Sequence, residues 1–228
     1  MKLLDLFFPP KCLSCRRFLE NGDRNLCSSC ESQWPHLTAS RCTCCVLPFE
    51  NSAALSHLCG DCLARPKSFQ EVSAIGRYRG ILHDLILRLK YRGDEWLSGF
   101  LGKKLSAVIT NPYDLIVPIP LSRDRLRERG FNQALLLARE IGRHRGIAVD
   151  PFILQKTRST PPQAGLKGKE RWENLKGVFT VREPEKIQGK RILLIDDVYT
   201  TGATLEMASR ELLHDEARTI DAAVLARA

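Results

Sequence analysis

The stretch RILLIDDVYTTGATLE, residues 191–206, decides the fold that this sequence predicts. Its branched apolar residues Ile192–Ile195 are typical of a strand that is buried on both faces of a sheet. Two adjacent acids, Asp196 and Asp197, follow this strand directly. A loop of threonine and glycine then leads into a helix that we expect over residues 203–214. A strand, a loop and a helix in this order indicate a parallel α/β sheet.

The rest of the chain after residue 66 repeats this alternation. We expect further strands over residues 72–78, 114–120 and 219–225, and further helices over residues 81–89, 97–109 and 132–144. The apolar residues of the helices recur at intervals of three and four. Together these elements predict an α/β fold, a mainly parallel sheet with helices on both faces. Ligands of such sheets bind at the carboxyl ends of the strands, where residues 118–130 and 196–204 lie.

The loop after the acidic pair has the composition of a phosphate site. Its backbone N–H groups can converge on a phosphate, helped by the N-terminus of the following helix. Three threonine hydroxyls add donors, and Gly202 lets the backbone come close. Asp196 and Asp197 can accept hydrogen bonds from hydroxyls or oppose a metal ion. A phosphate on one side and vicinal hydroxyls on the other describe a ribose 5-phosphate.

Three other interpretations of the acidic pair are weaker. A Walker B strand also ends in acids, but its companion motif G-x-x-x-x-G-K-[ST] does not occur in the sequence. A phospho-acceptor aspartate normally accompanies further acids on an earlier strand. A structural pair that caps a buried strand is the remaining alternative.

All nine cysteines lie between Cys12 and Cys62, which predicts a separate small domain over residues 1–65 and an α/β domain over residues 66–228. The spacings C-x2-C-x11-C-x2-C and C-x2-C-x13-C-x2-C are typical of zinc knuckles. The predicted zinc ligands are Cys12, Cys15, Cys27, Cys30, Cys42, Cys45, Cys59 and Cys62. Four thiolates at each ion leave no open position, so both sites are expected to be structural. Cys44 is left over and could replace a neighbouring ligand. Disulfides are the alternative, but they require an oxidising compartment.

The charge and the N-terminus restrict partners and location. A net charge of +9 favours polyanionic or phosphorylated partners. The opening MKLLDLFFPP has too short an apolar run for a secretory signal. No window approaches the ~18 apolar residues of a membrane span. We therefore expect a cytoplasmic protein without a membrane span.

The acidic pair and its loop resemble the signature of the type I phosphoribosyltransferases. The resemblance implies that catalytic Asp196 and Asp197 face the ribose hydroxyls of phosphoribosyl pyrophosphate (PRPP), which binds together with Mg2+. It also implies that residues 117–134 contain the pyrophosphate loop and that residues 156–179 form a mobile loop. The implied PRPP-binding residues besides the acids are Val198, Tyr199, Thr200, Thr201, Gly202, Ala203, Thr204, Ser122 and Arg123.

The cysteine-rich head, Leu89-Lys90-Tyr91 and the RGFNQ sequence of residues 129–133 extend the resemblance to the ComF family, which includes ComFC-type competence proteins and GntX proteins. The resemblance implies a role in handling imported single-stranded DNA, with a ComFA-type helicase as partner, or in the use of DNA as a nutrient. The mobile-loop and DNA candidates are Arg129, Asn132, Gln133, Arg158, Gln163, Lys169, Arg171 and Asn174.

Two functions remain open. Residues 123–145 contain seven arginines and residues 156–176 contain six lysines or arginines, which favours binding of single-stranded DNA. The aromatic residues near them either stack on bases or belong to the core; they are Phe131, Trp172, Tyr199 and Tyr91. The alternative is an active transferase that displaces pyrophosphate from PRPP, with charge stabilised by Arg123, Arg158 and Lys169 or Arg171. The sequence ends directly after the last expected strand, so we expect no C-terminal hood that selects a base, and the acceptor is not predicted.

Overall fold

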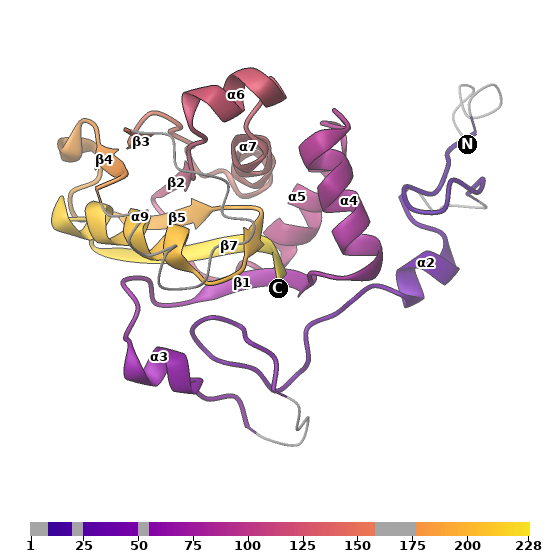
Figure 1. Ribbon diagram of the computed structural model, residues 1–228, viewed down its shortest axis with the longest axis horizontal. Helices are drawn as coiled ribbons and strands as arrows, with labels where there is room; N and C mark the ends of the chain where they lie inside the picture. Colours follow the sequence, from indigo (N-terminus) through magenta and orange to yellow (C-terminus); the bar gives the residue numbers. More distant parts are fainter. Residues whose placement is uncertain (1–8, 20–24, 50–54, 158–176) are drawn as a thin grey trace.

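A computed structural model describes residues 9–19, 25–49, 55–157 and 177–228 (Figure 1). Its centre is a parallel sheet in the order β1-β7-β5-β2, with a short β6 paired to β7. The strands are β1 (Val72–Arg77), β2 (Leu115–Pro118), β5 (Arg191–Ile195), β6 (Val198–Tyr199) and β7 (Thr219–Arg227). Each pairing in this sheet is parallel, which confirms the predicted fold class.

Strand β5 is apolar because it lies between two neighbouring strands and has helices packed against both of its faces. Leu193 pairs with Ile116 of β2 on one side and with Asp221 of β7 on the other. Successive side chains point to opposite faces of a strand. Accordingly, Leu193 belongs to one hydrophobic cluster and its neighbour Leu194 to the other.

Three helices cover one face of the sheet and a fourth covers the other. The first group is α4 (Gly80–Tyr91), α5 (Leu97–Val108) and α7 (Gln133–Arg145), and the fourth helix is α9 (Ala203–His214). The apolar side chains of each group share a cluster with the strand residues that face them. Figure 1 shows α4, α5 and α7 gathered together, away from α9.

Several short elements do not follow from the sequence patterns. They are α6 (Arg123–Arg129), the antiparallel pair β3 (Leu154–Lys156) and β4 (Phe179–Val181), and the 3-10 turn η1 (Pro184–Lys186). Helix α6 buries no residue, so it lacks the apolar periodicity by which helices are predicted. The pair β3–β4 flanks residues 158–176, which lie outside the described part of the chain.

The cysteine-rich head contains the same local structure twice. A β-bridge joins Lys11 to Phe18 in the first copy and Arg41 to Pro48 in the second. Short helices follow, α2 (Ser28–Ser32) and α3 (Gly60–Ala64), each of which begins directly after a cysteine. The head is therefore a tandem pair of ribbons, as its cysteine spacing predicts.

The head covers the open edge of the sheet. Strand β1 is the edge strand, and its Val72 N–H donates to the carbonyl of Cys44 at 2.8 Å. The N–H of Arg77 donates to the carbonyl of Pro35 at 2.7 Å, and the indole of Trp34 donates to the carbonyl of Ile75 at 2.8 Å. These contacts blunt an edge that could otherwise pair with another chain. In Figure 1 the segment that carries α3 runs below β1.

A buried carboxylate fastens the segment between the head and the sheet to helix α9. Glu206 is 1% exposed and accepts hydrogen bonds from both the backbone N–H and the hydroxyl of Ser68, each at 2.8 Å. The guanidinium of Arg210 donates to the same carboxylate at 2.8 Å. Because three donors meet one ionised group, its burial is compensated.

We predict that Glu206→Gln lowers the free energy of unfolding by about 1–3 kcal/mol, because the new amide N–H2 faces donors in place of an acceptor. Chemical denaturation measures this difference. Glu211→Gln on the same helix removes the same charge without these partners and is the matched control. Equal effects of the two substitutions would contradict the proposed fastening.

Candidate functional site

Asp197 is buried at the carboxyl end of β5, and both of its carboxylate oxygens have protein partners. Its Oδ1 lies 2.7 Å from Nζ of Lys90 at the end of α4. Its Oδ2 accepts a hydrogen bond from the amide of Gln133 in the first turn of α7. Although burial opposes it, the charge of Asp197 holds the pKa of Lys90 above its ordinary value. This aspartate thus joins two helices to the strand end.

Asp196 has a different environment. It retains partial exposure, and its Oδ1 accepts the backbone N–H of Asp197 at 2.8 Å. Burial, followed by the negative charge of Asp197, raises the pKa of Asp196 to about 7, against the nearby positive charges of Lys90 and Lys156. Asp196 is therefore the acid of the pair whose charge lacks an ion-pair partner among the described residues. A ligand could supply a partner, either a hydroxyl that donates a hydrogen bond to the carboxylate or a cation that pairs with its charge.

The RGFNQ residues position this pair. Asn132 caps α7 by accepting the N–H of Ala134 at 3.0 Å, and its amide donates to the carbonyl of Ile119 at 3.0 Å. Gln133 accepts a hydrogen bond from Arg129 at 2.5 Å while it donates to Asp197. A polar chain therefore runs from Arg129 through Gln133 to the acidic pair. Arg129, Asn132 and Gln133 were predicted as mobile-loop or DNA contacts, not as residues that position the acids. Lys90 was not predicted as a site residue; its signal in the sequence is a lysine beside buried apolar residues of its helix.

The loop after the acids forms a small cavity lined by Asp196 and residues 198–205. Gly202 has φ +77 and stands directly before α9. A Cβ on Gly202 would lie 2.1 Å from the hydroxyl oxygen of Tyr199, so glycine is required both by backbone conformation and by space. Tyr199 itself is buried at 3% exposure, with its ring packed edge-on against Phe69. Its ring is therefore part of the core.

The remaining predicted residues fall into two groups. Ser122 is buried and caps α6, accepting the N–H of Arg125 at 3.5 Å, while Arg123 is exposed on the first turn of that helix. The second group lies outside the described residues and comprises Arg158, Gln163, Lys169, Arg171, Trp172 and Asn174.

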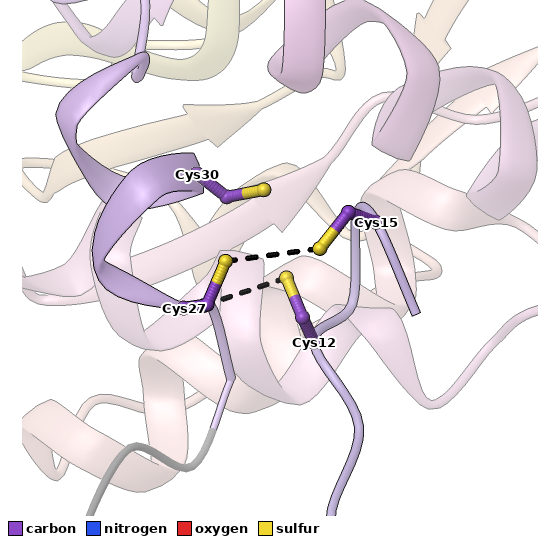
Figure 2. Close-up of side chains that lie close together, drawn as sticks. All are labelled: Cys12, Cys15, Cys27 and Cys30. Atoms are coloured by element: carbon purple, nitrogen blue, oxygen red, sulfur yellow. Dashed lines mark hydrogen bonds between the residues drawn. The ribbon is translucent and has the colours of Figure 1, made fainter. Parts of the chain in front are cut away.

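The first cysteine set converges on one point (Figure 2). Its four members are Cys12, Cys15, Cys27 and Cys30, whose sulfurs all lie within 4.8 Å of one another. The sulfurs of Cys15 and Cys27 are 3.7 Å apart, and the N–H of Cys27 donates to the sulfur of Cys12 at 3.4 Å. Four cysteine sulfurs around one point fit a tetrahedral structural zinc ion.

The second set repeats this arrangement in a more buried position. It comprises Cys42, Cys45, Cys59 and Cys62. The sulfur of Cys42 accepts the N–H groups of Cys45 and Cys59 at 3.5 and 3.3 Å. Despite opposing burial, such N–H groups lower the pKa of Cys42 to about 7 and that of Cys12 to about 6. None of the nine cysteines, all of which lie in the described residues, forms a disulfide. Cys44 lies outside both sets, with its sulfur 4.0 Å from the carbonyl oxygen of Phe69.

The parallel sheet and the two four-cysteine sets define an α/β protein that carries a tandem zinc ribbon. A family model described as the double zinc ribbon domain matches residues 3–63, and one described as the phosphoribosyl transferase domain matches residues 128–228. The chain also overlaps the purine phosphoribosyltransferase structure from Pyrococcus horikoshii, with a TM-score of 0.34 and 22% identity over 61% of this chain and 76% of that one.

Curated relatives identify the family. Competence protein F of Haemophilus influenzae is 32% identical over 90% of this chain and 92% of its own length. The DNA utilization protein YhgH of Escherichia coli K12 is 32% identical over 97% of this chain and 99% of its own. Competence protein ComFC of Bacillus subtilis is 32% identical over 86% of this chain and 81% of its own. The chain belongs to the ComF family of competence and DNA-utilisation proteins.

Within the described residues, no helix has both the length and the apolar character needed to cross a membrane.

We predict that Cys45→Ala lowers the zinc content by one ion per chain, because Cys45 is a member of the second set. Cys44→Ala, its sequence neighbour, should leave the content unchanged. Inductively coupled plasma mass spectrometry of the purified variants measures both. Loss of zinc from Cys44→Ala would show that Cys44 is a ligand.

We predict that Gly202→Ala lowers the free energy of unfolding by about 2–4 kcal/mol, because the new methyl group meets Tyr199 in a left-handed backbone conformation. Gly130→Ala is the matched control, since Gly130 has φ +84 but open space around its Cβ position. It should cost only ~1 kcal/mol. Tyr199→Ala removes the ring atoms that the new methyl group would meet, so in a double-mutant cycle it should cost less stability in the Gly202→Ala background than in the wild type. Additive effects would exclude the clash.

Proposed function

We propose that the loop from Asp196 to Thr204 binds the phosphoribosyl group of PRPP together with Mg2+, and that the protein acts on or with single-stranded DNA during DNA uptake or utilisation. The observation that supports the first half is the small cavity lined by Asp196 and residues 198–205, directly before the N-terminus of α9. A loop at a helix N-terminus presents N–H groups to a phosphate.

The unequal acids support a role for each. Asp196 would accept hydrogen bonds from the ribose hydroxyls, since it has no cation paired to it in the described structure. Asp197 was predicted to face these hydroxyls too, and this stays a prediction; Lys90 and Gln133 already occupy its two oxygens. Mg2+ bound to PRPP would neutralise the pyrophosphate. Arg123 lies on the exposed first turn of α6, where the pyrophosphate loop is expected.

The charge and the relatives support the DNA role. The net charge of +9 favours a polyanion, and the named relatives are competence and DNA-utilisation proteins. Arginines of α6, the helix that follows β2, supply part of this charge at the carboxyl end of the sheet. We also propose a cytoplasmic location and a ComFA-type helicase as partner.

An active transferase is the second candidate. Lys156 on β3 interacts electrostatically with Asp196, and burial, followed by the charge of Arg125, lowers the pKa of Lys156. Cations close to the acidic pair can stabilise a departing pyrophosphate. The acceptor would be a group that enters beside this lysine.

We predict that Asp196→Asn weakens PRPP binding in the presence of Mg2+ by about tenfold or more, since a charged acceptor for the ribose hydroxyls is lost. Isothermal titration measures the affinity. Because the pKa of Asp196 is about 7, wild-type affinity should fall more steeply than the variant's affinity as pH decreases from 8 to 6, since the phosphates of PRPP titrate alike with both proteins.

A raised pKa in the folded state means that stability is lost as pH rises through that value. Asp196→Asn should therefore be about 1–2 kcal/mol more stable at pH 8.

Binding of PRPP by both proteins with equal affinity would contradict the assigned role of Asp196. Release of pyrophosphate from PRPP by the wild type alone would favour the transferase over a binding protein. Steeply salt-dependent binding of single-stranded DNA that survives Asp196→Asn supports the DNA role as a separate property. If neither PRPP nor DNA binds the zinc-loaded protein, both halves of the proposal fail.

A further inference from the structure

An arginine-lined pocket lies between the first zinc ribbon and the last turns of α4. Its volume is about 400 Å3, and its lining residues are Ser14, Arg16, Asp84, Leu87, Arg88 and Arg92. Three of these residues are arginines and one is the exposed Asp84, whose carboxylate lies 3.0 Å from Nδ1 of His83; a second carboxylate, that of Asp94, pairs with Arg88. The pocket therefore carries a positive charge and suits an anion.

Arg88 is the buried member of this pocket. It is 8% exposed, and its Nε donates to Asp94 at 2.7 Å while its Nη1 donates to the carbonyl of Leu13. Its Nη2 is buried and has no hydrogen-bond partner among the described residues. Because this nitrogen is enclosed by protein atoms, Arg88 holds the ribbon against α4 and does not itself donate to a ligand in the pocket.

The zinc knuckle positions a second arginine at the same pocket. Arg16 follows Cys15 directly, and its N–H donates to the carbonyl of Cys12 at 3.0 Å. Its φ of +65 is in the left-handed region, which non-glycine residues seldom adopt. The side chain of Arg16 is exposed and lines the pocket, so the fold of the ribbon presents a cation there.

An exposed aromatic ring stands at the same end of α4. Tyr91 is 70% exposed, and the guanidinium carbon of Arg129 lies 5.1 Å from its ring centroid. Tyr91 is three residues after Arg88 and directly before Arg92, so the three share the final turn of the helix. Arg129 is in turn held by Gln133, which contacts Asp197. A polar chain therefore connects the ring to the proposed phosphoribosyl site.

We propose that this pocket and Tyr91 together bind one nucleotide unit of single-stranded DNA. The backbone phosphate is bound by the exposed Arg16 and Arg92, and an adjacent base stacks on the open side of the Tyr91 ring. Base stacking on an aromatic ring beside basic residues is the general mode of single-strand binding. An acidic peptide could enter the arginine pocket, but its carboxylates would not stack on the exposed Tyr91 ring. The inference rests on the DNA half of the proposed function.

The test uses zinc-loaded full-length protein and a short fluorescein-labelled oligothymidylate, followed by fluorescence anisotropy over a series of salt concentrations. Tyr91→Ala should weaken binding about tenfold with an unchanged salt dependence, and Tyr91→Phe should bind like the wild type, because stacking needs the ring alone. Arg16→Gln and Arg92→Gln should each reduce the slope of log affinity against log salt by about 0.7. These three side chains are exposed, so the substitutions do not disturb the core.

The matched control is Arg218→Gln, an exposed arginine that precedes β7 at the opposite end of the sheet. It should leave the slope unchanged. If the wild type binds the oligonucleotide but all the variants behave like Arg218→Gln, this inference is overturned while the DNA role stands. If the wild type does not bind, the DNA half of the proposed function fails. Competition by polyglutamate that is lost in Arg16→Gln and retained in Tyr91→Ala would assign the pocket to an acidic protein partner and overturn the nucleotide site.

Discussion

The buried ion pair between Asp197 and Lys90 determines where the elements around the site can lie. A carboxylate that is 7% exposed is tolerated only if its charge is paired and its lone pairs are occupied. Lys90 and Gln133 meet this condition from the end of α4 and the start of α7, so both helices must meet β5 at its carboxyl end. With Asp197 satisfied inside the protein, Asp196 is the acid that the proposed ligand would contact, and burial, followed by the charge of Asp197, raises its pKa.

A second constraint acts at β1, the edge strand that the head covers. The head is too small to have a large core of its own, and its cysteine sets instead belong to the two hydrophobic clusters of the sheet. Cys12 shares a cluster with α4 and α5, while Cys45 shares the other with Tyr199 and α9. Zinc that orders the ribbons would therefore also stabilise the contacts between the head and β1 and the packing of the Tyr199 ring.

The sequence predicts those features whose causes are local. The apolar run of β5 and the helical periodicity before His214 are local patterns, and the cysteine spacing reflects the tight geometry of a knuckle. Helix α6 lacks a buried face and could not be predicted in this way. The unequal environments of the two acids depend on Lys90 and Gln133, which lie more than sixty residues away in the chain and meet them only in the fold.

The chemistry of the two proposed ligands explains why they require separate contacts. An acid that reads vicinal ribose hydroxyls recognises PRPP but gains less from DNA, whose sugar lacks the 2′-hydroxyl. A single strand must therefore be held by its phosphates and by the faces of its bases. The end of α4 offers contacts of this kind in Arg92 and Tyr91, outside the loop of the acidic pair. Arg129 and Gln133 connect the ring to Asp197, so the proposed sugar-phosphate site and the proposed strand-binding surface would lie side by side in this fold.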